Sequence, residues 1–243
     1  MARDVYEEKI VFDEKQCDSY KNGTIGDLAR YMEAATRKHV EELGIDTIKL
    51  VENGTLWVIC WSQININRMP KKDESVILKS WPGAIKYGLL TRRFKFMDEA
   101  GNTLVEVSST FTIIDGKTRS QTDIPEDIKA IPVVKFDDDM PIPKLSMNFP
   151  DNLDSSFKHE VKDSEIDING HVNNAFYLEW AYSALGEKYI NEHPVKSIWI
   201  EYSHEIRGGS TVDIKYKLEE GALYLRGFVE GEKAYSVKIE LDK

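Results

Sequence analysis

The sequence predicts an α+β fold in which two tandem domains each wrap an antiparallel β-sheet around one long helix. Three observations support this fold class. A short strand, a bend, a long helix and several strands occur in that order twice along the chain. In both copies the spacing of apolar residues changes after the helix, from a period of about 3.6 to a period of 2. A stretch that holds five of the eight prolines separates the copies and is typical of a linker.

We therefore expect an N-terminal domain over residues 1–130, a linker over 131–153 and a C-terminal domain over 154–243. A chain of 243 residues is long enough for two domains that each bury an apolar core. The repetition of one plan on both sides of the linker indicates an internal duplication.

The N-terminal domain begins with a strand over 6–12, and the pair Asn22-Gly23 then favours a bend. Its strands are expected over 63–67, 89–97 and 105–114, with a hairpin connection between the last two. The long helix between them is marked by apolar residues at helical spacing: Ile25, Leu28, Met32, Ala35 and Leu43.

The C-terminal domain repeats this order, with a strand over 157–161 and a bend at Asn169-Gly170. The segment 31–35 of the first helix resembles the segment 177–181 of the second, which makes Glu33 and Glu179 equivalent positions in the two copies. The apolar face of the second helix consists of Phe176, Trp180, Ala184 and Leu185. Four further strands are predicted over 197–202, 212–218, 223–229 and 234–241.

Composition excludes several classes of protein. A net charge of -10 disfavours binding to nucleic acid or to an anionic membrane, because both need a positive surface. No apolar run approaches the roughly 18 residues that span a bilayer. The first residues lack the apolar core of an export signal, so we expect a cytoplasmic protein. The two cysteines, Cys17 and Cys60, have no spacing for zinc or a redox dithiol, and we predict neither metal nor cofactor.

The segment 167–174, Asp-Ile-Asn-Gly-His-Val-Asn-Asn, carries the strongest functional signal. In an extended segment alternate residues share a face, so Asp167, Asn169 and His171 are expected to converge on one volume. A turn followed by a helix cap would explain an Asn-Gly-His sequence by itself. It does not require so many polar groups, and Glu205 adds another.

These residues resemble the acyl-acyl-carrier-protein thioesterases, a family of tandem double-hotdog proteins, and the match runs nearly end to end. In the C-terminal half it rests on Asp167-x-Asn169-x-His171 with the following Val-Asn-Asn, and on Glu201-Tyr202 before Glu205. In the N-terminal half it rests on turn and sheet positions: Trp57, Arg68-Met-Pro70, Asp73, Trp81-Pro82, Arg92, Asp98, Thr118-Arg119 and Pro125.

The resemblance implies that Asp167, Asn169, His171 and Glu205 form the catalytic set of a thioester hydrolase. Its substrate would be a fatty acyl chain linked through phosphopantetheine to acyl carrier protein (ACP), in fatty acid biosynthesis. Plant members carry a cysteine directly after the glutamate, where this chain has Ile206, which favours a carboxylate route over a cysteine nucleophile. The chain also lacks the long N-terminal extension of a plastid-targeted member, so the resemblance points to a bacterial-type, cytoplasmic form.

Thioester hydrolysis gives each residue a role. Asp167 can activate a water molecule as general base or attack the carbonyl itself, and the sequence leaves both routes open. His171 could share the proton, Glu205 could hold the imidazole or the water, and Asn169 could position either. Backbone N–H groups at the start of the second helix would stabilise the oxyanion. Because the first helix is preceded by 23–25, Gly-Thr-Ile, we expect one active site per chain, with the N-terminal domain shaping acyl selectivity.

Other hypotheses remain open at this point. The chain could be an acyl-CoA thioesterase, a hydratase-like hotdog enzyme or a non-catalytic acyl-binding sensor, and Glu179 is an alternative helical base. A homodimer is also possible. A local basic patch for the acidic ACP could come from scattered cationic residues: Arg68, Lys71, Lys72, Arg92, Arg93, Lys117 and Arg119.

Overall fold

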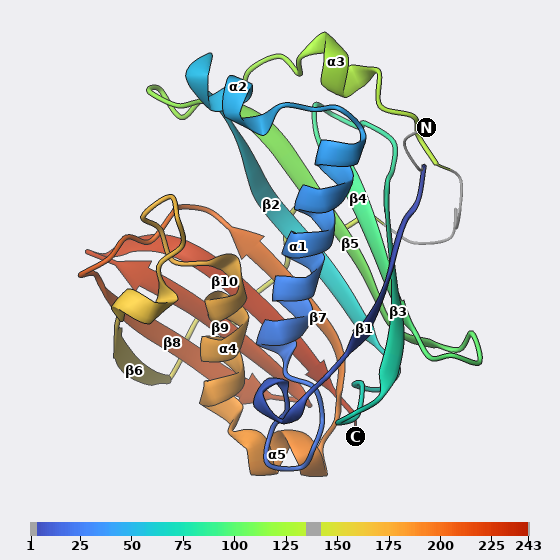
Figure 1. The fold of residues 1–243 in the computed structure, drawn as a ribbon. Coiled ribbons are helices and arrows are strands. Elements are labelled where there is room, and N and C mark those ends of the chain that lie inside the picture. The colour runs from blue at the N-terminus through green and yellow to red at the C-terminus, as the bar shows by residue number, and fades with distance from the viewer. Residues whose placement is uncertain (1–3, 135–141, 243) are drawn as a thin grey trace.

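The computed structural model describes residues 4–134 and 142–242, so part of the predicted linker, 135–141, lies outside the described residues. Figure 1 shows a strongly curved sheet with two long helices lying against it. The N-terminal half contains β1 (Tyr6–Val11), α1 (Ile25–Glu42), α2 (Thr47–Glu52), β2 (Thr55–Ile66), β3 (Ser75–Pro82), β4 (Leu90–Met97), β5 (Thr103–Asp115) and α3 (Glu126–Lys129). The C-terminal half contains β6 (Ser155–Glu160), α4 (Asn174–Leu185), α5 (Glu187–Glu192), β7 (Val195–Tyr202), β8 (Thr211–Glu219), β9 (Ala222–Val229) and β10 (Glu232–Leu241).

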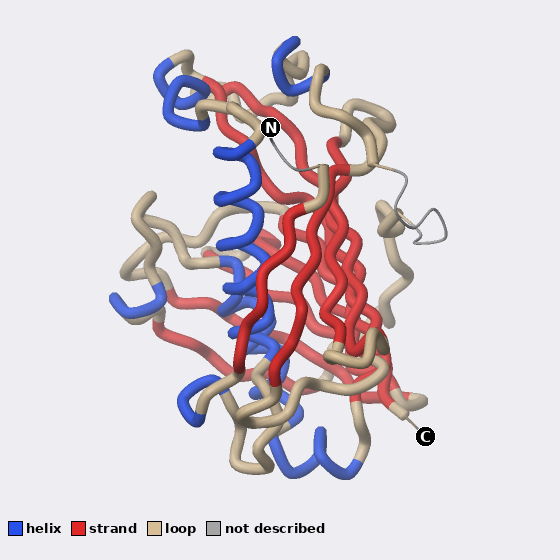
Figure 2. The backbone as a smooth tube through the Cα atoms, turned by 45° about the vertical axis from the view of Figure 1, so that its right-hand side comes forward, coloured by secondary structure: helices blue, strands red, loops and turns tan. Residues whose placement is uncertain are grey.

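The strands form one antiparallel sheet in the order β1-β3-β4-β5-β2-β7-β10-β9-β8-β6. Each half has the same internal order, and the halves join where β2 pairs with β7. In the turned view of Figure 2 both long helices lie on the same side of the sheet. The predicted α+β architecture, a long helix wrapped by an antiparallel sheet in each half, is confirmed.

The two long helices begin at side-chain caps that the sequence provides. The Thr24 hydroxyl accepts a hydrogen bond from the Asp27 N–H (3.1 Å) and caps α1. The Asn173 side chain accepts one from the Ala175 N–H (2.9 Å) and caps α4. Such caps satisfy N–H groups that the first turn of a helix leaves unpaired. The entry to each helix is therefore fixed, and in the C-terminal half this is where the predicted motif lies.

The helices pack against each other through polar contacts. Arg30 on α1 forms an ion pair with Glu179 on α4, with 2.8 Å between Nη2 and Oε1. Gly26 permits this approach, since a Cβ atom there would lie 1.8 Å from Glu179 Oε1. Asn173 Nδ2 donates to Glu33 Oε2 across the same interface (2.7 Å). Glu179 thus joins the two halves, and this position does not support its alternative role as a catalytic base.

Gly227 on β9 gives a test of the packing in the C-terminal half. A Cβ atom there would lie 1.9 Å from Tyr235 Cε1, and that ring is fully buried. We expect Gly227→Ala to reduce the free energy of unfolding by about 1–3 kcal/mol, because the rigid ring must shift. Denaturant unfolding checks this, with Gly208→Ala as control, since its Cβ would make only ordinary contact with Ile166 (3.7 Å). Equal stability of the two variants would contradict the packing described.

Among the described residues, no helix is both long and apolar enough to cross a lipid bilayer.

Candidate active site

The predicted motif forms a closed loop. Ile166 and Val172 make an antiparallel bridge, and the Asp167 N–H donates to the His171 carbonyl oxygen (2.8 Å). Asp167 Oδ1 accepts the N–H groups of Asn169 (2.8 Å) and His171 (3.2 Å). The expectation of an extended segment with alternating faces is therefore wrong. The carboxylate closes the turn by hydrogen bonding to backbone two and four residues on, as aspartate commonly does.

His171 and Glu205 come together, as the family resemblance implied. The loop between β7 and β8 lies beside the motif, because the Val172 N–H donates to the Ile206 carbonyl oxygen (2.7 Å). His171 Nε2 then lies 3.2 Å from Glu205 Oε2. The imidazole is about one-quarter exposed, so a substrate can reach it.

Arg119 is a site residue that the sequence analysis missed. It follows β5 in the N-terminal half, and its guanidinium pairs with Oε1 of Glu205. The carboxylate of Glu205 therefore bridges an imidazole from one half and a guanidinium from the other. No pattern near the motif indicates this contact, which arises only because β2 and β7 join the two halves into one sheet.

Asp167 and Asn169 form a second pair in the site. Asn169 is exposed, and its Nδ2 donates to Asp167 Oδ2 (3.2 Å). Within the described residues, no hydrogen bond joins the Asp167 carboxylate directly to the imidazole of His171. Tyr177 lies near both pairs: burial, and then the charges of Glu205 and Asp167, raise the pKa of its hydroxyl. The four predicted residues thus form two pairs, linked by the backbone of one loop and by their common neighbour Tyr177.

The first turn of α4 offers the Asn174 N–H as a donor for an oxyanion. Across the described part of the chain, the backbone N–H of Asn174 has no hydrogen-bond partner. Its neighbours are all engaged: His171 with Asp167 Oδ1, Val172 with the Ile206 oxygen, Asn173 with the Glu165 oxygen, and Ala175 and Phe176 with Asn173. The Asn174 N–H, at the positive end of the helix dipole, is therefore a candidate for the expected oxyanion donor.

The buried carboxylate of Glu165 holds the loop in place through hydrogen bonds to neighbouring elements. Glu165 accepts hydrogen bonds from His159 Nε2 (2.9 Å), the Lys162 N–H (2.9 Å) and Trp180 Nε1 (3.3 Å). Burial opposes its ionisation, but these hydrogen bonds outweigh burial and lower the pKa of Glu165. Because its backbone oxygen also accepts the Asn173 N–H (2.9 Å), Glu165 ties the loop to α4 and β6.

The N-terminal half contains the same loop without the same side chains. Asp18 Oδ1 accepts the N–H groups of Tyr20 and Asn22, as Asp167 does in its own loop. The Gly23 N–H donates to the Pro70 oxygen (2.7 Å), matching the contact of Val172 with Ile206. When the two loops are aligned on these contacts, Asn22 is equivalent to His171 and Met69 is equivalent to Glu205. The first loop keeps the aspartate but has neither the imidazole nor the glutamate.

The same register corrects the predicted alignment of the two helices. Counted from the caps Thr24 and Asn173, Arg30 takes the place of Glu179. The predicted equivalence of Glu33 and Glu179 is therefore wrong. The error arose because the similar segments 31–35 and 177–181 lie one turn apart along their helices, and a shift of about one turn preserves the apolar face.

A narrow apolar cavity lies between α1 and strands β2, β4 and β5. Its volume is about 40 Å³, far below the roughly 300–1,000 Å³ of a typical ligand pocket. Thr36 lines it and lies about one helical turn from Glu33, which contacts Asn173 at the motif. Further lining residues are Val40, Leu43, Trp57, Leu90, Arg92, Phe111 and Ile128. About one turn of α1 thus separates the cavity from the contact of Glu33 with the motif, and none of the four predicted site residues lines the cavity.

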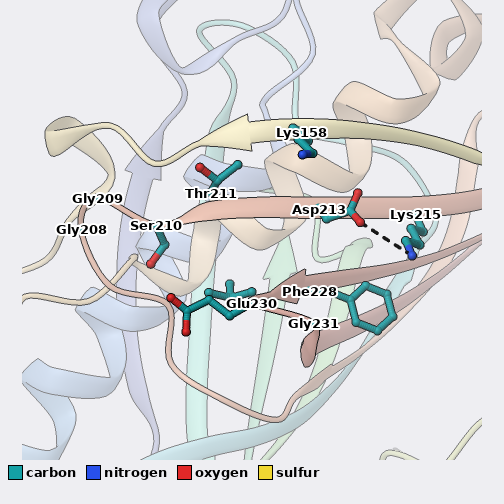
Figure 3. A pocket seen from close by; sticks show the side chains of 11 residues that line it. Lys158, Gly208, Gly209, Ser210, Thr211, Asp213, Lys215, Phe228, Glu230 and Gly231 are labelled. Atoms are coloured by element: carbon teal, nitrogen blue, oxygen red, sulfur yellow. Dashed lines mark ion pairs between the residues drawn. The ribbon is translucent and has the colours of Figure 1, made fainter.

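A larger hollow, about 610 Å³, lies elsewhere on the C-terminal half (Figure 3). It is open and polar, and Asp213 and Lys215 on β8 face it and pair with each other at 3.7 Å. On the same strand Val212 and Ile214 are buried, so the hollow lies on the opposite face of the sheet from α4. It contains none of the predicted site residues.

The two cysteines, Cys17 and Cys60, both lie within the described residues, and neither is a good candidate for a nucleophile. Ile206, which stands where plant members carry cysteine, is almost fully buried. Burial raises the pKa of Cys60 to about 11, which keeps it protonated at neutral pH. Burial and nearby carboxylates raise the pKa of Cys17 as well.

A long helix wrapped by a curved antiparallel sheet, present twice in one chain, defines the class as a tandem hotdog protein, as predicted. The acyl-ACP thioesterase N-terminal domain matches residues 3–131, and the acyl-ACP thioesterase C-terminal domain matches residues 150–241. The chain belongs to the acyl-ACP thioesterase family, which confirms the resemblance drawn from the sequence.

Known proteins agree with this assignment. A dodecanoyl-ACP hydrolase of Umbellularia californica is 24% identical over 232 residues, covering 82% of this chain and 60% of its own length. An acyl-ACP hydrolase of Cuphea viscosissima is 23% identical and covers 76% of this chain and 48% of its own length. The chain thus spans roughly half of these curated chloroplast relatives.

Solved structures share the fold over nearly the whole chain. An acyl-ACP thioesterase from Bacteroides thetaiotaomicron aligns with a TM-score of 0.87 at 20% identity, covering 98% of both chains. The 12:0-ACP thioesterase from Umbellularia californica aligns with a TM-score of 0.86 at 20% identity, covering 98% of this chain and 96% of its own.

Proposed function

We propose that this protein hydrolyses fatty acyl-ACP to free fatty acid and holo-ACP. One observation carries the proposal: Glu205 contacts both His171 and Arg119 beside the Asp167 loop, at the capped start of α4. Family membership and the printed activities of the plant relatives support the same substrate class.

Asp167 is the proposed base or nucleophile. Its Oδ1 is held by two backbone N–H groups, whereas Oδ2 accepts only the Asn169 amide among the described residues. Oδ2 is therefore the oxygen that takes a proton from water as the water attacks the thioester carbon. Direct attack by the same oxygen, through an anhydride that water then opens, remains the second route. Both routes yield a carboxylic acid and a thiol.

The other groups have supporting roles. Glu205 orients the imidazole through Nε2, and His171 Nδ1, which makes no hydrogen bond within the described residues, can then carry a proton to the leaving thiolate. Asn169 positions the water through its amide, and the Asn174 N–H receives the developing oxyanion. Losing an oxyanion donor of this kind typically costs about 3–4 kcal/mol in barrier.

The acyl chain is proposed to bind in the N-terminal domain, residues 1–130. The cavity beside α1 supports this location, as does the filled interior of the C-terminal half. There Tyr177 packs against Tyr235 with ring centroids 4.8 Å apart and against Tyr202 at 5.5 Å. Because the cavity is narrow, side chains around it must move when a chain enters. The C-terminal domain, residues 154–243, is proposed to carry the single catalytic set.

The predicted basic patch for ACP is smaller than the sequence suggested. Arg92 is 6% exposed and is not part of the surface. Arg68 pairs with Glu74, Lys72 pairs with Glu14, and Arg119 pairs with Glu205. The proposed preference for ACP over CoA is therefore supported by family membership and not by a basic surface. The cytoplasmic location and the homodimer remain predictions.

Thiol release from one acyl chain presented on ACP and on CoA tests the proposal. We expect release from both, with kcat/KM at least about tenfold higher for ACP, which corresponds to about 1.4 kcal/mol. Equal values would overturn the ACP preference and favour an acyl-CoA thioesterase. Binding without release would favour a sensor, and addition of water to an enoyl thioester would favour a hydratase.

A further inference from the structure

A layer of buried polar side chains crosses the interior of the N-terminal half. Each long element there contributes one residue to this polar layer, and each of these is no more than 6% exposed. The residues are His39 on α1, Ser62 on β2, Ser80 on β3, Arg92 on β4 and Ser109 on β5. Burying five polar side chains together is unusual for a core, because moving a polar group out of water is energetically unfavourable.

Arg92 is the centre of the polar layer. Its Nε donates to Ser80 Oγ (2.9 Å), and its Nη2 lies 2.9 Å from His39 Nδ1. Ser109 is its register partner on β5, and Ser109 Oγ lies 2.8 Å from Ser62 Oγ on β2. Burial lowers the pKa of Arg92 to about 9, so it remains charged at neutral pH. Within the described residues no carboxylate pairs with it.

The polar layer separates two apolar regions. The main core includes Ala35, Phe94 and Val107 and continues into the C-terminal half. The distal cluster consists of Val40, Ile45, Leu50, Leu90, Ile113, Ile124 and Ile128, with Leu43, Trp57, Phe111 and Ile131 packed on it.

Along α1, β2, β4 and β5 the polar residue lies between residues of the main core and residues of the distal cluster. Along β4, Phe94 belongs to the main core, Arg92 to the polar layer and Leu90 to the distal cluster. Along α1, His39 lies between Ala35 and Leu43 in the same way. The cavity lies among residues of the distal cluster, and Arg92 is part of its wall.

We infer that the polar layer is the floor of the acyl-binding chamber and sets the longest fatty acyl chain that the protein accepts. The inference rests on the proposed function and assigns Arg92 as a specificity-determining residue. Each methylene group buried in the distal cluster strengthens binding by roughly 0.8 kcal/mol. To continue into the main core, a chain must pass the guanidinium and break its hydrogen bonds, which leaves a buried charge unsatisfied.

The longest accepted chain length, called the ceiling below, could instead be set by the volume of the chamber alone, and that alternative makes a different prediction. In that case any added space around the chamber would lengthen the accepted chain, whichever side of the polar layer it lies on. With the polar layer as floor, space in the main core has no effect while Arg92 is charged.

Binding of free fatty acids of increasing length tests the inference without requiring catalysis. By calorimetry, wild-type affinity is expected to rise with length and then stop rising. Arg92→Met removes the charge and keeps the side-chain length, so affinity should continue to rise beyond the wild-type ceiling, by about tenfold for two further methylenes. Arg92→Lys keeps a cation and should keep the wild-type ceiling. An identical ceiling in the wild type and Arg92→Met would overturn the inference.

A second pair of variants tests the same point with Arg92 in place. Leu90→Ala enlarges the distal cluster and should raise the ceiling, whereas Phe94→Leu enlarges the main core and should not. A ceiling raised equally by both variants would show that volume decides and would overturn the inference. Absence of thiol release from any acyl thioester, with the ceiling in binding intact, would overturn the hydrolase proposal and leave the polar layer as the floor.

Discussion

Asp167→Asn is expected to lower kcat for thioester hydrolysis by about 10²–10⁴-fold, the usual contribution of a general base. Asparagine retains a carbonyl oxygen that can accept the N–H groups of Asn169 and His171, so the loop should keep its shape. The basic oxygen is lost, and with it the acceptor of the hydrogen bond from Asn169 Nδ2. Steady-state thiol release and the midpoint of thermal unfolding measure the two effects separately.

The chain provides a matched control for this variant. Asp18 closes the equivalent loop of the N-terminal half with the same two backbone contacts. Asp18→Asn should therefore change neither kcat nor stability appreciably. If Asp167→Asn retained more than about a tenth of the wild-type kcat, or if Asp18→Asn lost as much activity, the assignment of Asp167 as base or nucleophile would be wrong.

Glu205→Gln is expected to lower kcat by about 10²-fold, because the amide cannot hold both the imidazole and the guanidinium as the carboxylate does. His171 would lose its charged partner at Nε2, and Arg119 would lose its ion pair with the C-terminal half. Initial rates of thiol release at saturating substrate measure the effect.

Two controls test whether this loss is specific to the bridge. Glu201 lies near the end of β7, the strand that precedes the loop of Glu205, and pairs with Lys233 at 2.6 Å, away from the imidazole. Glu201→Gln should therefore leave kcat near the wild-type value. Arg119→Leu should also reduce kcat, and combining it with Glu205→Gln should cost less than the sum of the single effects. Fully additive effects would contradict the view that Arg119 acts through Glu205.

Much of the fold could be predicted from local patterns. The periods of α1, β4, β5 and β7 to β10 are visible in the sequence, and the bounds differ by only a few residues. β3 and the first half of β2 were missed. Thr55 to Trp61 is a nearly continuous apolar run, and such runs do not distinguish a strand from a buried helix.

The candidate site could be predicted where it is local. Asp167, Asn169 and His171 belong to one loop, so their spacing already places them together, although a hydrogen-bonded turn and not strand alternation does so. Glu205 came from the family resemblance. Arg119 and the polar layer depend on contacts between distant segments, which the register of the sheet creates and no short sequence pattern encodes.

The repeat accounts for the different roles that we propose for the two halves. Both halves keep the aspartate loop and the capped helix, but Asn22 and Met69 replace the imidazole and the glutamate in the N-terminal copy. That copy instead has the distal cluster, the narrow cavity and the polar layer. A duplicated unit can divide catalysis and chain binding between its copies in this way, because the shared sheet holds them in fixed register.

A crystal structure of the protein bound to a non-hydrolysable acyl-phosphopantetheine thioester analogue would test the central claim most directly. The account predicts that the carbonyl carbon lies beside Asp167, with its oxygen toward the Asn174 N–H. It also predicts that the acyl chain runs along α1 among the distal cluster and ends at Arg92. An analogue bound in the open hollow on β8, or with its chain in the C-terminal half, would contradict the account.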